Sequence, residues 1–238
     1  MRQALRKYIR SSYFKPSFFG LFTNPFWIAR SCLWNAIESQ SCLLQGKLLD
    51  VGCGMKPYRE LFNVDSYTGL EYDNEAARNL GVADIFYDGK KLPFLNGEFD
   101  SILCNQVLEH VFNPDTFLSE IARVLKSEGT LLLTIPFVWD EHEQPYDYAR
   151  YTSFGLSHLL QEHGFEILSQ KKLCNDISIL FQLLNAMIFK WIPNNRAMQI
   201  VFTIFPMSLI SVAGYIFGLI LPKNNDLYLD QLVLAKKL

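Results

Sequence analysis

Residues 47–58 read Lys-Leu-Leu-Asp-Val-Gly-Cys-Gly-Met-Lys-Pro-Tyr. The short apolar run around Asp50 predicts a buried strand, and Gly52 and Gly54 predict a tight turn after it. Glycine lets the backbone approach a ligand because no Cβ stands in the way. Pro57 suits the first position of a helix, where its missing N–H would have no partner. We therefore predict a strand, a turn and a helix start that together hold a nucleotide-like ligand.

Apolar runs alternate with helical patterns through the centre of the chain. Asp50, Glu71, Asp88 and Asn105 fall where these runs end. The alternation predicts a parallel sheet covered by helices on both faces, and ligands of such sheets bind at the carboxyl ends of the strands. We therefore expect these side chains to converge on one crevice. The expected strands are 47–51, 66–71, 83–87, 99–104 and 129–136, and the expected helices lie near 57–63, 73–80, 105–111, 114–126 and 153–163.

The details of the glycine turn separate the ligand families that use it. The dinucleotide fingerprint G-x-G-x-x-G would place a glycine where Pro57 stands. An acid two residues before Gly52, with G-C-G after it, instead resembles motif I of the class I S-adenosylmethionine (SAM) methyltransferases. The combination G-C-G-x-K-P-Y resembles a subgroup in which several members act in bacterial cell-surface polysaccharide pathways. Further segments also resemble the small-molecule methyltransferase group often called type 11, and they follow in the order typical of that group. These segments are 67–71, 83–89, 92–94, 99–104, 107–111, 120–126 and 129–136.

The resemblance covers the chain from Leu48 to Lys172 and implies a Rossmann-like α/β fold with a seven-stranded sheet. The sixth strand is expected at Phe165–Ser169, and the seventh, antiparallel to the others, at Leu229–Lys236. The predicted organisation is a basic and aromatic N-terminal cap at 1–46, a SAM-binding core at 47–175, an apolar helical hairpin at 176–222 and a last core strand at 223–238.

The resemblance also implies SAM as the cofactor and a role for each residue of the turn. Gly52, Cys53 and Gly54 would pass under the methionine portion of SAM, and Asp50 would hold the loop or the amino group. The commonest form of the motif has a third glycine where this chain has Lys56. We therefore expect a slightly different loop geometry and a helix that packs less closely on the strand.

Residues at later strand ends complete the implied cofactor site. Glu71 would accept from both ribose hydroxyls, a role that needs two oxygens on one rigid group. Asp88 would accept from the adenine amino group, and Asn105 and Gln106 would lie beside the pocket, through side chain or backbone. A single acid at a strand end could instead cap the next helix. The occurrence of all of them in this order favours the cofactor site.

The loop at 137–152 is the best candidate for acceptor chemistry. The SAM sulfonium is already a good electrophile, so the protein mainly aligns a nucleophile and excludes water. A hydroxyl nucleophile also needs a base, and His142 is the candidate because an unperturbed imidazole titrates near neutrality. Glu143 or Asp140 would orient it. The alternative is an ordinary surface loop whose Tyr-rich end caps the following helix.

Other side chains near this loop would bind the acceptor. Arg150 could hold an anionic substrate group, and Tyr146 and Tyr151 could line a sugar- or ring-shaped site. His110 is a second candidate because the family motif places it near the pocket, although a histidine there is more often structural.

The N-terminal segment is locally basic. Between Met1 and Ile37 there are no acids, while aromatic residues alternate with Arg2, Arg6, Lys7, Arg10, Lys15 and Arg30. The segment lacks the uninterrupted apolar core and the cleavage site of a signal peptide. It could attach the protein to an anionic membrane surface, or it could form a helical cap over the cofactor pocket.

An apolar insertion separates the last two expected strands. Its parts are 177–192 and 197–221, and the second part carries no charge and is long enough to cross a bilayer. A single crossing would leave the seventh strand on the wrong side of the membrane from its sheet. We therefore expect a shallow helical hairpin that lies on one leaflet or forms a lid over the substrate entrance. A buried dimer or intrachain interface is the alternative.

Composition limits the remaining possibilities. The chain has 238 residues, a net charge of −2 and five cysteines. This charge offers no general attraction to nucleic acid, and the cysteines show no paired or metal-like spacing, which suits a reducing compartment. We expect no metal site. We expect a cytoplasmic enzyme, peripheral at the inner face of the membrane, in which a homodimer is an open possibility.

The predicted activity is SAM-dependent methyl transfer to a hydroxyl oxygen of a glycan or lipid-linked small molecule. A quinone-like or other apolar small molecule is the alternative acceptor. A membrane-associated protein that binds SAM without turnover is the third interpretation.

Overall fold

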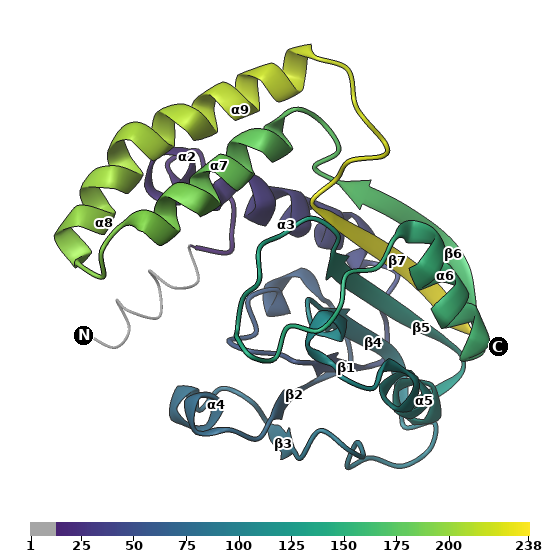
Figure 1. Cartoon of the computed structure of the whole chain (residues 1–238). Coiled ribbons are helices and arrows are strands. Elements are labelled where there is room, and N and C mark those ends of the chain that lie inside the picture. Colours follow the sequence, from purple (N-terminus) through teal and green to yellow (C-terminus); the bar gives the residue numbers. More distant parts are fainter. Residues whose placement is uncertain (1–12) are drawn as a thin grey trace. The chain divides into compact units, whose positions relative to one another are not determined.

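The computed structural model describes residues 13–238, which divide into two compact units. Figure 1 shows the course of the chain and the labels of its elements. The predicted segments 1–46 and 176–222 fall largely in unit 1, and most of the predicted core falls in unit 2. Unit 1 comprises the described part of Met1–Ala36 with Val138–Asp140 and Lys172–Asp230, and unit 2 comprises Ile37–Phe137, Glu141–Lys171 and Gln231–Leu238.

The strands form one seven-stranded sheet in the order β3-β2-β1-β4-β5-β7-β6, as expected for a Rossmann-like α/β fold (Figure 1). β1 pairs in parallel with β2 and β4, and the pairs β2–β3 and β4–β5 are also parallel. Parallel pairing brings the carboxyl ends of these strands to one edge. The strands are β1 (Lys47–Val51), β2 (Ser66–Tyr72), β3 (Ile85–Tyr87), β4 (Phe99–Asn105), β5 (Leu125–Pro136), β6 (Phe165–Leu173) and β7 (Asp230–Lys237).

β7 runs antiparallel to β6, as predicted for the last strand. The Leu229 N–H donates to the Leu173 carbonyl at one end (3.1 Å), and the Leu238 N–H donates to the Gly164 carbonyl at the other (2.9 Å). The chain thus returns from the apolar insertion to place its last strand between β5 and β6.

Helices that pack on the sheet begin at side-chain caps. The Asn74 side chain accepts from the Ala77 N–H, and the Thr152 side chain accepts from the Gly155 N–H (3.1 Å). Such caps satisfy backbone donors that have no partner inside the helix. The helices of unit 2 are α4 (Glu75–Leu80), α5 (Pro114–Val124) and α6 (Ser153–Glu162), with short 3₁₀ helices η1 (Arg59–Leu61) and η2 (Leu108–His110).

The helices predicted at 57–63 and 105–111 are wrong, because only η1 and η2 form there. Lys56 and Gln106 have φ values of 52° and 55°. A residue in this left-handed region turns the backbone away from a right-handed helix where the helix would have to begin. Pro57 therefore does not start an α-helix.

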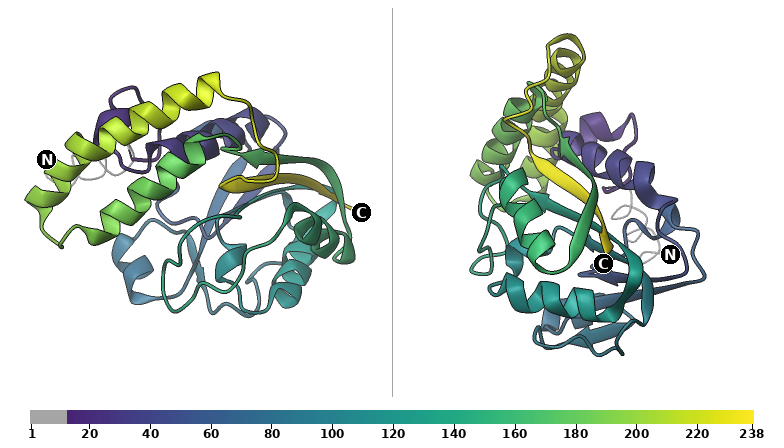
Figure 2. Two further views of the ribbon diagram at one scale, coloured as in Figure 1. Left: turned by 45° about the horizontal axis from the view of Figure 1, so that its top comes forward. Right: turned by 90° about the vertical axis from the view of Figure 1, so that its right-hand side faces the viewer.

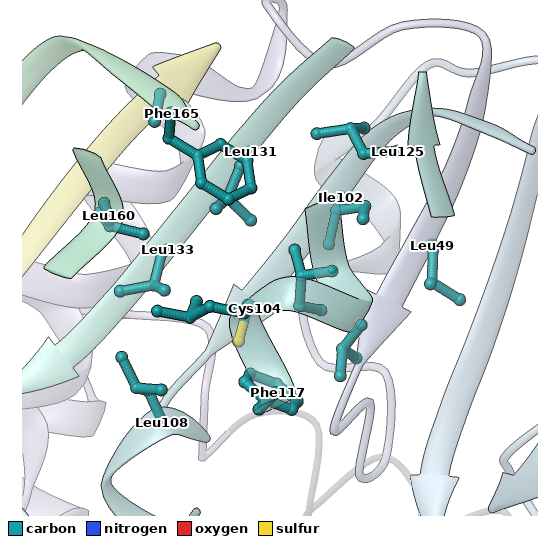
Figure 3. Close-up of a cluster of buried hydrophobic side chains, with 14 of the residues drawn as sticks. Leu49, Ile102, Cys104, Leu108, Phe117, Leu125, Leu131, Leu133, Leu160 and Phe165 are labelled. Carbon is teal, nitrogen blue, oxygen red and sulfur yellow. The ribbon is translucent and has the colours of Figure 1, made fainter. Parts of the chain in front are cut away.

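The core of unit 2 consists of side chains from the central strands and from α5 and α6. Leu49, Ile102 and Leu133 are fully or almost fully buried, and Figure 3 shows them with Phe117 of α5 and Leu160 of α6. Burial of each large apolar side chain contributes about 1.5–3 kcal/mol relative to exposure. The continuous burial along β1 explains why its sequence is apolar rather than alternating.

Unit 1 contains the predicted helical hairpin, and Figure 2 shows its long helices side by side. The Asn185 amide donates to the Ser211 hydroxyl (2.9 Å), and a Cβ at Gly214 would lie 2.7 Å from Phe181 Cβ. The helices of unit 1 are α2 (Gly20–Thr23), α7 (Ser178–Trp191), α8 (Arg196–Phe202) and α9 (Ser208–Ile220), the kinked segment η3 (Thr203–Met207) joins the last two, and α3 (Trp27–Ser41) begins in this unit.

The N-terminal segment packs on the hairpin within unit 1. Gln182 of α7 is fully buried, and its side chain accepts from the Ala29 N–H and donates to the Pro25 carbonyl, each at 3.1 Å. The Trp27 and Tyr215 rings make an edge contact with centroids 5.6 Å apart. The described part of the N-terminal segment and the apolar insertion therefore share one packed unit, and the basic residues Arg2, Arg6, Lys7 and Arg10 lie outside the described residues.

A disulfide joins Cys32 of α3 to Cys174, which follows β6. A disulfide is not what the reducing compartment expected from the cysteine spacing would favour. The partners are 142 residues apart in sequence, so spacing gave no signal. Cys42 is free and exposed, whereas Cys53 and Cys104 are free and buried.

Candidate active site

The glycine turn follows β1 and has the open backbone that the sequence predicts. Gly52 and Gly54 have φ values of 70° and 50°, a region that favours glycine. A Cβ at Gly52 would lie 2.3 Å from Val107 Cγ2, so the turn packs directly against the segment that follows β4. A Cβ at Gly54 would meet nothing within 4 Å. Gly54 therefore exposes bare backbone to a ligand.

Glu71 closes the glycine turn from the neighbouring strand. Its Oε2 accepts from the Gly54 N–H (2.6 Å), and its Oε1 accepts from the Tyr72 N–H (3.0 Å). Each carboxylate oxygen has a second lone pair, so the group can still accept from two hydroxyls. Glu71 thus fits the predicted contact with both ribose hydroxyls.

Lys56 replaces the third glycine of the common motif and takes a structural role. Its Nζ lies 2.6 Å from Asp84 Oδ2, and Asp84 also accepts from the Gly69 N–H (2.7 Å). A Cβ at Gly69 would lie 2.3 Å from Lys56 Cε. The Lys56 side chain therefore crosses β2 at Gly69, which ties the glycine turn to the segment before β3.

Asp50 lies beneath the turn and is 4% exposed. Burial raises the pKa of its carboxyl to about 7, although the Tyr67 hydroxyl donates a hydrogen bond to it, which acts in the opposite direction. Burial, together with Asp50, also raises the pKa of the Cys53 thiol to about 12. The hydrogen bond from Tyr67 joins Asp50 to β2, so both of its predicted roles, holding the loop and holding the SAM amino group, stay predictions.

The remaining predicted cofactor residues have local partners. Asp88 is exposed and accepts from the Lys90 N–H (3.0 Å), so its contact with adenine stays a prediction. Asn105 accepts from the Thr134 hydroxyl (2.7 Å), and the Gln106 N–H donates to the Thr134 carbonyl (3.0 Å). Asn105 and Gln106 thus fix the end of β4 to β5 beside the glycine turn.

The loop after β5 docks on η2. The Tyr148 and Ala149 N–H groups donate to the Glu109 carbonyl at 2.8 and 3.3 Å. This docking places the His142 ring against the His110 ring, with centroids 4.7 Å apart. Parallel pairing puts the ends of β4 and β5 at the same edge as the end of β1, so both histidines lie at the edge that carries the glycine turn.

Asp147, which sequence reasoning did not select, orients His142. Its Oδ2 lies 3.2 Å from His142 Nδ1 and accepts from the His142 backbone N–H (3.0 Å). The prediction of Glu143 or Asp140 in this role is not met, because Glu143 is exposed and Asp140 pairs with Lys190 at 2.5 Å in unit 1. The acidic composition of the loop was a usable signal, but the choice among its acids required the loop conformation.

Residues 49–133 match the protein-family model described as a methyltransferase domain. This part of the chain is a methyltransferase domain. A ubiquinone biosynthesis O-methyltransferase of Dechloromonas aromatica is 32% identical to it over 111 residues, 40% of this chain and 47% of that protein. A fatty-acid O-methyltransferase of Mycolicibacterium smegmatis is 30% identical over 114 residues, 43% of this chain and 41% of that protein. The chain spans about half the length of the curated relatives that it matches.

The fold of the methyltransferase domain is shared with solved structures. A phosphoethanolamine N-methyltransferase of Haemonchus contortus, in complex with SAM, superposes with a TM-score of 0.56 at 16% identity and covers 86% of this chain and 52% of that chain. SAM, which that structure holds, is also the cofactor that the sequence predicts for this domain. Gly54, with open space above its backbone, and Glu71, with its two acceptor oxygens, fit this cofactor.

The predicted acceptor-binding residues of the methyltransferase domain differ in their partners and in their exposure. The Arg150 guanidinium binds Asp147 at two points, 2.5 and 2.7 Å, and it lowers the pKa of that carboxyl to about 2. Arg150 therefore positions the loop, and its contact with an anionic substrate stays a prediction. Tyr146 is exposed and available to a substrate, whereas Tyr151 packs against the core of unit 2.

Proposed function

We propose that this chain is an enzyme that transfers a methyl group from SAM to a hydroxyl oxygen of a glycan or lipid-linked small molecule. The observation that carries the proposal is the contact between His142 Nδ1 and Asp147 Oδ2 at 3.2 Å. SAM supplies an electrophilic methyl group, and a hydroxyl acceptor needs a base to take its proton. The imidazole of His142 lies at the edge of the sheet that also carries the glycine turn.

His142 acts as the base and Asp147 as its positioning residue. Asp147 stays ionised because Arg150 holds it, and an ionised carboxylate at Nδ1 stabilises the imidazolium that forms when the ring takes a proton. The acceptor oxygen then forms its bond to the methyl carbon while the carbon–sulfur bond breaks. The exposed Tyr146 and Tyr148 offer aromatic faces and hydroxyls to a sugar or ring beside this base.

The names of the relatives support oxygen as the acceptor atom. Two relatives that match the domain are named as O-methyltransferases, one of ubiquinone biosynthesis and one of fatty acids. Because both names refer to apolar molecules, a quinone-like or other apolar small molecule is the second candidate acceptor. Lipid-linked glycans and apolar molecules are both found in membranes. The exposed apolar side chains of unit 1 support membrane association of the enzyme.

We also propose that the protein is cytoplasmic and peripheral at the inner face of the membrane. Among the described residues, Arg196–Ile220 is the helical region that is long and apolar enough to cross a bilayer, and 28% of its most apolar window is buried. A single crossing would separate β7 from the sheet that contains it. A hairpin that lies in one leaflet keeps β7 in place. The exposed apolar side chains of unit 1 include Phe18, Phe19, Trp191, Phe205, Leu219 and Ile220.

Methyl transfer from labelled SAM to prenyl-linked sugars, quinols and fatty acids tests the proposal. His142→Gln should lower the rate about 10²–10⁴-fold and leave SAM affinity unchanged, because only the base is lost. Glu71→Ala should weaken SAM binding by about 1.5–3 kcal/mol, as measured by calorimetry, because a charged acceptor is lost. His158→Gln is the matched control, since His158 lies exposed on α6.

Two results would contradict the proposal. Failure of the folded protein to bind SAM would remove the enzyme interpretation. SAM binding without transfer to any acceptor would favour the third interpretation, a membrane-associated protein that binds SAM without turnover.

A further inference from the structure

Glu109, His110 and His142 form a cluster of potential metal ligands that the sequence did not predict. One potential ligand atom from each residue lies within 4.8 Å of the others, and His110 Nε2 lies 3.8 Å from Glu109 Oε1. The Glu109 side chain is 0% exposed, whereas the side chains of His110 and His142 are 21% and 31% exposed. A buried carboxylate thus lies at the base of the cluster, and two imidazoles open it to solvent.

Each imidazole is held by its Nδ1, which determines the role of its Nε2. His110 Nδ1 lies 2.8 Å from the Tyr146 carbonyl, and a carbonyl only accepts, so Nδ1 carries the proton. His142 Nδ1 faces the ionised Asp147 carboxylate at 3.2 Å. Histidines that bind metals generally donate their other N–H to a carbonyl or a carboxylate in this way. Both rings therefore present Nε2 as the ligand nitrogen.

The separation of the His110 and Glu109 ligand atoms suits one cation. With Nδ1 protonated, the Nε2 lone pair of His110 and the Glu109 carboxylate are two acceptors that face each other. Two atoms bound to one ion at about 2.0–2.2 Å lie roughly 3–4 Å apart, which matches their separation of 3.8 Å. A cation between them would replace the repulsion of two acceptors by attraction to a shared charge.

We propose that Glu109, His110 and His142 bind one divalent transition-metal ion. Two imidazoles and a carboxylate favour Zn²⁺, Mn²⁺ or Fe²⁺ over Mg²⁺ and Ca²⁺, which prefer oxygen ligands. Three protein ligands leave coordination positions open to a hydroxyl. The site also explains why the carboxylate of Glu109 is buried beside two histidines at the acceptor edge of the domain.

The consequence for the reaction rests on the proposed function. When the ion is bound, its charge lowers the pKa of the acceptor hydroxyl, the hydroxyl proton passes to a solvent water and His142 serves as a ligand. The base role that the proposed function gives to His142 is then that of the metal-free protein. The acceptor oxygen forms its bond to the methyl carbon, and the electron pair of the breaking carbon–sulfur bond stays on sulfur. Without the ion, His142 itself takes the proton.

Metal binding can be measured without SAM or an acceptor. The full chain is freed of metals with a chelator, and Mn²⁺ is titrated while the electron paramagnetic resonance signal of free Mn²⁺ is recorded; Zn²⁺ is titrated by calorimetry. We expect one site per chain. His110→Ala and His142→Ala should each weaken binding at least about 10-fold, because the loss of a direct ligand should exceed the loss of a residue that only orients a ligand. His158→Ala, outside the cluster on α6, should leave binding unchanged.

Other variants and readouts keep the test decisive. Glu109→Gln changes a buried group, so its fold is checked by circular dichroism, and the half-exposed His142 supplies the independent variant. Absence of Mn²⁺ and Zn²⁺ binding, or binding that both histidine variants retain, would overturn the metal site. Because the measurement needs no turnover, a failure of methyl transfer would count against the proposed function and not against the site.

Discussion

At the residue scale, Asp50 illustrates how the surroundings of a motif residue set its chemistry. The motif predicts an acid before the glycine turn, but not that β1 buries this acid or that the Tyr67 hydroxyl donates to it. Tyr67 lies at the start of β2, and the two strands pair in register there. The pKa of Asp50, about 7, is thus a property of the sheet.

The raised pKa of Asp50 predicts that the free energy of unfolding falls as pH rises. Above about pH 4 the unfolded carboxyl is ionised while the folded one keeps its proton until about pH 7, so the unfolded state binds fewer protons. Between pH 5 and pH 8 the free energy of unfolding should therefore fall by about 2–3 kcal/mol because of Asp50, at about 1.4 kcal/mol per pKa unit. Urea unfolding at both values measures the loss.

Asp50→Asn should remove this part of the pH dependence, because the amide does not titrate. Asp65→Asn, at an exposed carboxyl, is the control and should retain it. Parallel pH profiles for the wild type and Asp50→Asn would show that the folded carboxyl ionises normally.

Residues that bind ligands or set local geometry differ in how well sequence predicts them. Gly54 and Glu71 were predicted because the motif fixes their order and their strand ends. Asp147 was missed because several acids share its loop, and only the docking of the loop on η2 selects one of them. Lys56 was recognised as a departure, but its partner Asp84 depends on how the chain crosses β2.

At the element scale, the strands were predicted better than the connections between them. β1 has the predicted bounds because its residues from Leu48 to Val51 are buried without interruption. β5 begins at Leu125 rather than 129, directly after α5, because the pairing with β4 continues through a register shift. The predicted helices after the turn and after β4 fail because a single residue in each has a positive φ, which no periodicity reveals.

The disulfide between Cys32 and Cys174 should stabilise the first part of α3 against the junction of β6 and α7. Closing a loop of 142 residues lowers the conformational entropy of the unfolded chain. In the chain-entropy estimate this raises the free energy of unfolding by at most about 5 kcal/mol. Cys32→Ser, Cys174→Ser and reduced wild type should therefore all melt at a lower temperature than oxidised wild type. Thermal unfolding by circular dichroism, with and without reductant, measures this.

Cys42→Ser is the matched control, because Cys42 is exposed and free, and its melting temperature should equal that of wild type. If reductant leaves the wild-type melting temperature unchanged, the pair does not contribute. Thiol counting in freshly lysed cells adds a test of location, since a cytoplasm generally keeps such thiols reduced.

At the scale of the whole molecule, the chain joins a SAM-binding core to a unit with an unusually apolar surface. Phe18 makes edge contacts with Phe19 and with Phe22, although Phe18 and Phe19 are largely exposed. The exposed side of the hairpin belongs to the same unit. An exposed apolar surface of this kind indicates a membrane or another protein as its partner.

Membrane association predicts that the protein floats with anionic vesicles. Phe18→Ser with Phe19→Ser, or Leu219→Asp with Ile220→Asp, should each reduce the bound fraction several-fold, because the exposed apolar contacts with lipid are lost. Flotation with phosphatidylglycerol vesicles measures it, and Phe154→Ser, at an exposed ring of unit 2, is the control. The bound fraction should be lower with phosphatidylcholine vesicles because the N-terminal segment is basic.

A protein that stays with the soluble fraction would contradict this prediction. If the same substitutions instead dissociate a dimer in gel filtration, the apolar surface of unit 1 is an interface between copies of the chain, the alternative that the sequence left open.

The sequence by itself determined the class of fold, the cofactor turn and the apolar character of the insertion, because these depend on local patterns: an apolar run, glycines without a Cβ, an acid at a strand end. The tertiary structure alone decided which distant side chains meet. Cys32 pairs with Cys174, Asp147 orients His142, and Glu109 and His110 join His142. Such contacts follow from strand order and loop docking, which bring together residues that no sequence spacing connects.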